Sequence, residues 1–359
     1  MKKRLKGWRR GLAILCAVLL VLAGCCLLQL RHLAGLLPSQ SAAERWAGDG
    51  EMAFHQVSCY LTVEEPVTLN QIYAFRYAIL DKLHEAGLEA DTHTRLFRDA
   101  WSTTGKLEAA SDLNHGQVSV IAVGGDFFQF HPLRLLSGNY LTEDDVMEDR
   151  ILLDEEAAWL LFGSTDLAGM PVKLNGVPFV ISGVIEREQD FASRKAYTAG
   201  RGIFMSYDAF LHLNEKAAAT CYELVLAEPV LNFTRNFAAE KFPLGQGEMV
   251  ENTGRFDFFR LLGLVKQFGQ RSMQRLGVVY PYWENAARCV EDWGALLALI
   301  TVSALVIPAV TGLVLLYLAL RRGKEKLSEE LLPKAGEAVA EAVRKRQRKA
   351  WVKKHGEKW

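Results

Sequence analysis

The residues from Gly125 to Asp145, GDFFQFHPLRLLSGNYLTEDD, combine side-chain types that an active site uses. They include carboxylates, a histidine and a glycine turn, which could serve acid–base catalysis or bind a metal ion. His131 precedes a proline, however, and a residue before proline is typical of an extended turn. The acidic run Glu143, Asp144, Asp145 fits a solvated turn or a helix start, where negative charge suits the helix dipole. We therefore expect this stretch to build structure.

Sequence motifs of catalytic and cofactor sites are absent from the chain. There is no G-x-x-x-x-G-K-[ST] phosphate loop, no H-E-x-x-H or C-x-x-C metal pattern, and no G-x-S-x-G nucleophile turn. The eight histidines are scattered through the sequence. We predict that the protein is not an enzyme and that it has no cofactor and no metal site. A surface hydrolase is the weakest alternative, because a catalytic triad need not be local in sequence.

The distribution of charge divides the chain into two basic ends and an acidic body. Lys and Arg together number 42, as do Asp and Glu, so the formal net charge is zero and nucleic acid is not an expected partner. The first ten residues, however, carry six basic side chains, and the segment after Leu320 carries thirteen basic and six acidic ones. The body between them has 23 basic and 36 acidic residues, a net charge of −13.

Two uncharged apolar runs separate the basic ends from the acidic body. They are Gly11–Leu30 and Gly294–Leu320, and helices of these lengths cross a hydrocarbon layer of about 30 Å. Pro308 lies in the second run, where neighbouring Ser and Thr can satisfy the freed carbonyl. Lys and Arg cluster outside the two runs, so the positive-inside rule predicts cytoplasmic termini in a bacterial plasma membrane. Residues from about 31 to 292 would then be extracytoplasmic.

We expect six segments along the chain. They are a cytoplasmic basic N-terminus at 1–10, a transmembrane helix at 11–30, an extracytoplasmic domain at 31–252, a stalk with juxtamembrane helices at 253–293, a second transmembrane helix at 294–320, and a cytoplasmic basic tail at 321–359. In the stalk, residues 253–276 are predicted to be helical. Phe256, Phe259 and Leu262 would lie on its apolar side, and Arg255 and Arg260 on its solvated side.

The six cysteines fall into groups by location. Cys16, Cys25 and Cys26 lie in the first apolar run, where small apolar side chains pack well. LAGC at 22–25 also matches a lipoprotein cleavage site, so lipidation of Cys25 is an alternative to an uncleaved helix, although the apolar run continues beyond it. Cys59 and Cys221 lie in strand-like runs of the outer body, where they could form a disulfide or remain separate thiols.

The outer body mixes strands and helices without strict alternation, which predicts an α+β fold. HQVSCYLTV at 55–63 alternates like a half-buried strand, and a helix is predicted from about 70 to 86, with Thr68 as its cap and Leu80 among its apolar residues. Residues 95–123 are strand-like, with a turn at DLNHG. RILLDEEAAWLLFG predicts a strand and then a helix, and Asn175-Gly176 predicts a β-hairpin. CYELVLAEP is another strand, followed by a helix.

An ordered set of short motifs between about Val118 and Glu186 resembles the extracytoplasmic core domain of MacB-type and FtsX-like ABC transporter permeases. The resemblance begins with an Asp-aromatic-aromatic step and a glycine turn, followed by an acidic step. It continues with a helix ending in Leu-Phe-Gly, a small residue, and a hairpin that closes on Gly-Val. These features are carried by Asp126, Phe127, Phe128, Gly138, Leu161, Phe162, Gly163, Gly169, Gly183 and Val184.

The resemblance implies a MacB-like core domain inserted between two transmembrane helices, and structural rather than catalytic roles for these motif residues. It implies a non-enzymatic membrane subunit that couples a separate ABC ATPase, together with permease subunits, to the outer domain for export or mechanotransmission. Family permeases add three spans after the outer domain. Here one span and a basic tail follow it, so we expect a chain truncated after the second transmembrane helix relative to the family.

Other partners follow from charge and topology. The lipid bilayer surrounds the two spans, and the basic run at 344–354 favours contact with anionic headgroups over docking to an ATPase. Homo- or hetero-oligomers are compatible with the sequence. The alternative to a permease subunit is a membrane-anchored domain that binds or senses an extracytoplasmic ligand or protein.

Overall fold

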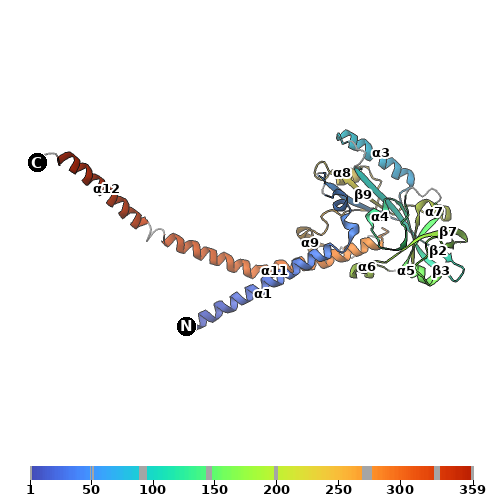
Figure 1. Ribbon diagram of the computed structural model, residues 1–359, viewed down its shortest axis with the longest axis horizontal. Helices are drawn as coiled ribbons and strands as arrows, with labels where there is room; N and C mark the ends of the chain where they lie inside the picture. Colours follow the sequence, from blue (N-terminus) through green and yellow to red (C-terminus); the bar gives the residue numbers. More distant parts are fainter. Residues whose placement is uncertain are drawn as a thin grey trace. The chain divides into compact units, whose positions relative to one another are not determined.

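The computed structural model describes residues 2–48, 50, 52–88, 95–142, 148–197, 201–268, 277–326 and 332–356. The chain divides into two compact units. The larger, Leu28–Leu299, contains the whole sheet and is the outer body of the protein (Figure 1). The smaller comprises Met1–Leu27 and Ile300–Trp359 and is helical in its described residues.

The outer body contains one mixed sheet of ten strands in the described part of the chain. The strand order is β10-β1-β9-β2-β3-β8-β5-β7-β4, and β6 pairs with both β2 and β7. Neighbouring strands are antiparallel, except that β3 with β8 and β5 with β7 are parallel. The strands are β1 Phe54–Tyr60, β2 Phe97–Ala110, β3 His115–Gly125, β4 Leu135–Gly138, β5 Arg150–Asp154, β6 Pro171–Leu174, β7 Val177–Ile185, β8 Gly202–Ser206, β9 Cys221–Ala227 and β10 Glu248–Glu251.

Helices of very different lengths surround this sheet or leave it. The structure confirms the predicted α+β class. The helices are α1 Lys2–Ala34, α2 Ala42–Ala47, α3 Leu69–Glu85, α4 Phe127–Phe130, α5 Glu155–Phe162, α6 Phe191–Ala196, α7 Tyr207–Leu213, α8 Phe233–Lys241, α9 Phe258–Leu264, α11 Tyr282–Lys326 and α12 Leu332–His355, with 3-10 turns η1 Pro38–Ser41 and η2 Val265–Gln267.

Local sequence signals set most of these boundaries. Helix α3 begins at a capping box, in which the Thr68 side chain accepts from the Gln71 amide and the Gln71 side chain accepts from the Thr68 amide. Strands β6 and β7 form the predicted hairpin, with Asn175 and Gly176 at φ of 47° and 85°. Two positive φ values are what a type I′ turn requires.

Each face of the sheet carries its own core. On one face α3, α5, α7 and α8 pack against the strands; α3 and α8 can be followed on this side in Figure 1. The opposite face is covered by α2, α4 and the first residues of α11, among which Trp283 is 2% exposed. We call residues 282–299, the part of α11 within the outer body, the base of α11.

The prediction that β1 is half-buried is wrong, because helices cover the second face of the sheet as well as the first. Ser58 and Tyr60 in β1 are fully buried, as are Val57 and Cys59 on the other side of the strand. The alternation in sequence identified the strand, but it could not reveal that a distant helix buries the polar side. Leu80 of α3, predicted to lie in the core, is 51% exposed.

The predicted stalk helix over 253–276 is corrected in its first part. Among the described residues of this stretch, 253–256 form a turn, Phe258–Leu264 is α-helical and Val265–Gln267 is a 3-10 turn, while residues 269–276 lie outside the described part of the chain. Phe259 is 83% exposed instead of packed. Arg255, predicted to be solvated, is 1% exposed, because it lies in a turn before α9 that folds back into the body.

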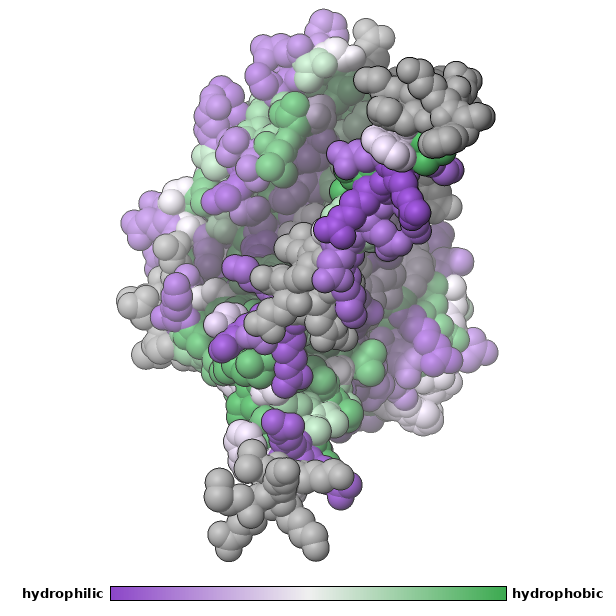
Figure 2. Space-filling model, turned by 90° about the vertical axis from the view of Figure 1, so that its left-hand side faces the viewer, coloured by the Kyte–Doolittle hydropathy of each residue, from purple (hydrophilic) through white to green (hydrophobic). Residues whose placement is uncertain are grey.

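Helices α1 and α11 contain the two apolar runs. Among the described residues, Gly7–Ala34 and Tyr282–Glu325 are long and apolar enough to cross a membrane, and most of their apolar side chains are exposed, unlike those of a core helix. In the smaller unit, Cys16 Sγ of α1 lies 3.7 Å from Thr311 Oγ1 of α11. Figure 2 shows green, hydrophobic residues on the apolar helices and purple, hydrophilic residues along α12.

Candidate functional site

The stretch that combined acidic residues with a histidine packs against the base of α11. Phe127 of α4 meets the Trp283 ring at 5.6 Å, and the His131 ring lies 4.4 Å from both of these rings. His131 Nε2 and Glu223 Oε2 of β9 are 2.6 Å apart, and both side chains are 2% exposed. This arrangement fixes α4 between the sheet and α11.

Two of the motif glycines allow a close approach of β4 and β7. A Cβ on Gly138, which has φ of 76°, would overlap the carbonyl oxygen of Ser182, and one on Gly183 would overlap that of Ser137. The other two lie in open turns. Gly163 ends α5 in the left-handed conformation, and Gly169 has φ of 86°. In each case the backbone conformation or the space explains the glycine.

The remaining motif residues are also structural in their surroundings. Leu161 and Val184 are fully buried in the core, and Phe162 packs on it. Phe128 stacks on Tyr140 with the ring centres 5.1 Å apart, and Asp126 accepts a hydrogen bond from Arg98 Nη1 at 2.7 Å. The acidic step at 143–145 lies outside the described residues.

The disulfide alternative is not formed in this structure. Cys59 and Cys221 lie on adjacent strands and are free thiols. Their Cα partners are Tyr222 and Tyr60, respectively, so the two thiols belong to opposite faces of the sheet. Burial raises the pKa of both thiols. Cys25 is exposed on the continuous helix α1, and its lipidation stays an alternative.

The most unusual site in the outer body is a group of charged side chains on the base of α11 and the elements around it. We call it the ion cluster. It consists of Arg255, Glu284, Arg288, Glu291 and Glu248. Such side chains are almost never fully buried unless they are paired. A cluster of this kind restricts how its elements can be arranged, because each charge must keep its partner.

Arg255 lies at the centre of the ion cluster. Its Nη1 and Nη2 donate to Glu284 Oε2 and Oε1 at 2.7 and 2.8 Å, a bidentate pair. Its Nε is 2.9 Å from Glu291 Oε1. Arg288 Nε donates to the same Glu284 carboxylate at 2.7 Å, and its Nη2 donates to Glu248 of β10 at 3.0 Å. The base of α11 is thus ion-paired to both a turn and an edge strand.

Neutral side chains extend the ion cluster into the sheet and the N-terminal segment. Tyr60 of β1 donates its hydroxyl to Glu284 at 3.0 Å. Gln40 Oε1 accepts from both Arg255 Nη1 at 2.8 Å and Asn252 Nδ2 at 2.9 Å. Asn252 in turn accepts from Ser58 Oγ at 2.9 Å. One continuous polar network therefore joins η1, β1, the turn before α9 and α11.

The electrostatics favour a permanently charged cluster. Burial is the largest single influence and lowers the pKa of Arg255, but Glu284, together with Tyr60 and Glu248, raises this pKa above the ordinary value of arginine. This site was not predicted from the sequence. Glu284, Arg288 and Glu291 recur at i, i+4 and i+7, which places them on one face of a helix, and this spacing was the available signal. Nothing in the sequence indicates that Arg255 reaches them.

Among the described residues, no group of three or more His, Cys, Asp or Glu side chains is placed to hold a metal ion. The centre of the ion cluster is also closed to solvent, since Glu284 is fully buried and Arg255 is 1% exposed. The ion cluster is therefore structural in character, and it joins the base of α11 to the sheet and to the turn before α9.

The central strands of the sheet are similar to those of known proteins. Residues 95–229 match the family model described as the MacB-like periplasmic core domain, a region that runs from just before β2 to just after β9. This chain carries a MacB-like periplasmic core domain. The match supports the resemblance to MacB-type permeases that the motifs in the sequence indicate. No curated protein matches the chain.

Three solved structures are similar to the MacB-like chain at low identity. The extracellular domain of the noncanonic ABC-type transporter YknZ from Gram-positive bacteria is 14% identical, with 52% of this chain and 92% of that chain covered and a TM-score of 0.35. The periplasmic region of MacB from Actinobacillus actinomycetemcomitans is 14% identical, with 61% and 94% covered and a TM-score of 0.37. A domain of a putative permease from Porphyromonas gingivalis is 10% identical, with 55% and 88% covered and a TM-score of 0.33.

Proposed function

We propose that this chain is a non-enzymatic membrane subunit of the ABC transporter permease class. It couples a separate ATPase, together with other permease subunits, to an extracytoplasmic MacB-like domain. Both termini are cytoplasmic, and the outer body lies on the far side of a bacterial plasma membrane. One observation supports the proposal most strongly. Residues 95–229 match the MacB-like core domain in a chain that also has two helices long and apolar enough to cross a membrane.

The ion cluster provides a physical route for the coupling. Helix α11 is continuous from Tyr282 to Lys326, so its base and its apolar run belong to one element. Separating the buried Arg255 from Glu284 leaves uncompensated charges, at a cost of about 3–5 kcal/mol. The base of α11 and strands β1 and β10 therefore shift together when α11 is displaced. Displacement driven by a partner ATPase is passed to the outer body in this way.

The test uses the full chain, co-expressed with its native neighbours and purified in lipid nanodiscs. We expect an ABC ATPase subunit to purify with it, and ATP to change hydrogen exchange of the backbone amides in β1 and β10. Tyr60→Phe removes one hydrogen bond to Glu284 and should reduce this change while ATP hydrolysis continues. Arg134→Gln alters an exposed ion pair with Glu186 and should leave it at the wild-type size.

Two outcomes would count against the proposal. One is that no ABC ATPase or permease subunit purifies with the full chain. The other is that an ATPase does bind, but ATP leaves hydrogen exchange in the outer body unchanged. In the second case the chain would be an accessory subunit without a mechanical role.

A specific observation also favours the alternative function, a membrane-anchored domain that binds an extracytoplasmic ligand. A cavity of about 850 Å³ opens between α3 and the start of β2, and its size falls in the range of about 300–1,000 Å³ that small-molecule sites occupy. We call it the α3 groove. Binding in the α3 groove is compatible with either function, because a permease subunit can also recognise its cargo.

A further inference from the structure

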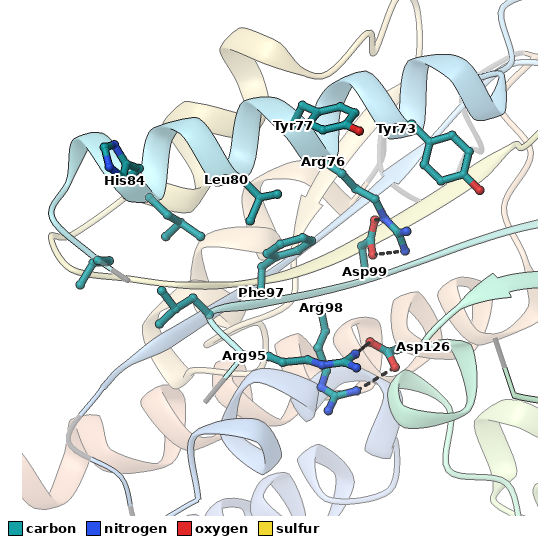
Figure 3. A pocket seen from close by; sticks show the side chains of 13 residues that line it. Tyr73, Arg76, Tyr77, Leu80, His84, Arg95, Phe97, Arg98, Asp99 and Asp126 are labelled. Atoms are coloured by element: carbon teal, nitrogen blue, oxygen red, sulfur yellow. Dashed lines mark hydrogen bonds and ion pairs between the residues drawn. The ribbon is translucent and has the colours of Figure 1, made fainter. Parts of the chain in front are cut away.

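One side of the α3 groove is a second, exposed apolar stripe of helix α3. Tyr73, Tyr77 and Leu80 recur at i, i+4 and i+7 on α3 and are 43%, 74% and 51% exposed. The core-facing stripe of the same helix, which includes Ile72 and Ile79, is buried separately. A surface helix normally turns polar residues outward. This helix therefore presents a second apolar face, which lines a cavity (Figure 3).

The polar residues in the α3 groove are mostly held in place by one another. Arg76 Nε and Nη2 donate to the two oxygens of Asp99 at 2.8 Å each, and Tyr222 OH donates to the same carboxylate at 2.9 Å. Arg98 donates to Asp126 at 2.7 Å, and its guanidinium lies 3.6 Å from the centre of the Trp46 ring. These two pairs form a rigid boundary.

Arg95 differs from the other two arginines. Its side chain is 68% exposed, and its Nη1 is 3.7 Å from Asp126, a carboxylate that Arg98 already engages. Among the described residues that line the α3 groove are three arginines and two aspartates, so these side chains carry one positive charge in excess. In Figure 3, Arg95 lies across the cavity from the exposed stripe of α3, with Phe97 between them. A guanidinium in this position can pair with a carboxylate or phosphate.

We propose that the α3 groove binds a small amphipathic organic anion. Its aromatic or aliphatic body lies against Tyr73, Tyr77 and Leu80, and its acidic group pairs with Arg95. This inference rests on the ligand-binding function and does not require ATPase coupling. The family match begins at residue 95, so it includes Arg95 and excludes α3. The apolar side that would select the ligand is thus a feature of this chain outside the matched region.

Photolabelling of the full chain in nanodiscs of neutral lipid tests the proposal without any ATPase present. The probe is 4-benzoylbenzoate, an aromatic acid that cross-links under light, and its neutral amide is the reference. We expect the acid to label residues 73–88 or 95–99, and excess 4-phenylbutyrate to suppress this labelling. Arg95→Gln should lower labelling about tenfold, the equivalent of one charge-assisted hydrogen bond, whereas Arg95→Lys should retain most of it.

Two further variants separate binding from folding. Tyr77→Ser removes part of the apolar stripe at a position that is 74% exposed, so it should lower labelling about tenfold without changing the unfolding midpoint. Asp81→Asn changes an exposed charge of α3 that does not line the groove and should label like the wild type.

Equal labelling by the acid and its neutral amide, or wild-type labelling of both Arg95→Gln and Tyr77→Ser, would overturn the proposal. So would labelling of the groove by a benzophenone-bearing peptide but not by the small acid. That last result would instead identify a protein-docking surface. None of these outcomes bears on whether an ATPase drives α11, so failure of this proposal and failure of the coupling function are distinguishable.

Discussion

Arg255 illustrates how a residue in a turn can govern the arrangement of several elements. It is 1% exposed and contacts the carboxylates of Glu284 and Glu291, both on the base of α11. Removing water from three such groups is costly, and their mutual attraction offsets this cost only while the geometry holds. The ion cluster therefore contributes little to the net free energy of unfolding. Its main effect is to fix one arrangement of the base of α11 and the elements around it.

Replacing Arg255 with methionine should be strongly destabilising, because it removes the cation that two buried carboxylates share. We expect a loss of about 3–5 kcal/mol in the free energy of unfolding, measured by urea denaturation of the full chain in nanodiscs. Arg134→Gln is the matched control, since the Arg134 side chain is 76% exposed and its pair should contribute no more than about 1 kcal/mol. Equal effects of the two changes would show that the ion cluster is not a special joint.

The two sheet cysteines should behave as unreactive separate thiols. Burial raises the pKa of Cys59 and Cys221, so at pH 8 each holds less of the reactive thiolate than an exposed cysteine with a pKa of about 8.5. We expect iodoacetamide to spare both in the folded protein and to modify both after denaturation without reductant. Mass spectrometry of the peptides reads out the result. A disulfide-linked pair of these peptides would contradict the structure.

At the scale of elements, strands β4 and β7 can pair only because the residues where their backbones come closest have no side chains. Gly138 and Gly163 both have positive φ, but a Cβ on Gly138 would overlap the Ser182 carbonyl, whereas nothing lies within 4 Å of one on Gly163. Gly163→Ala should cost about 1 kcal/mol for conformation alone. Gly138→Ala should cost about 1–3 kcal/mol more, from the overlap. Equal urea midpoints for the two variants would exclude this close approach.

Helix α3 shows how one element can have two apolar faces with different uses. Its buried face includes Ile72 and Phe75 and belongs to the core, whereas Tyr77 and Leu80 line a cavity. The periodicity predicted the helix and its cap, and the structure confirms both. The prediction that Leu80 is buried was wrong, because a stripe pattern does not distinguish a core neighbour from an open groove.

At the scale of the whole molecule, membrane topology can be tested with single cysteines in an otherwise cysteine-free chain. Asp112→Cys, in the exposed β2–β3 turn, should react with a membrane-impermeant maleimide in intact cells. Gln347→Cys, exposed on α12, should react only after the cells are opened. The opposite pattern would place the outer body in the cytoplasm.

The mass of the purified intact chain tests the first apolar helix. We expect a mass that retains residues 1–24, because the apolar run continues past Cys25 into Leu30. A mass that begins at a lipid-modified Cys25 would replace the first transmembrane helix with a lipid anchor. The second span and the MacB-like domain would remain.

The sequence by itself determined the features that depend on local patterns. Two apolar runs, the Asn175-Gly176 hairpin and the helix that ends at Gly163 follow from hydropathy and backbone preference, which act within a few residues. The ordered motifs also predicted the MacB-like domain. The positions of Arg255 and His131 were decided only by tertiary structure. Their partners, Glu284 and Glu223, lie 29 and 92 residues away in the chain, and burial of a charge depends on which distant element covers it.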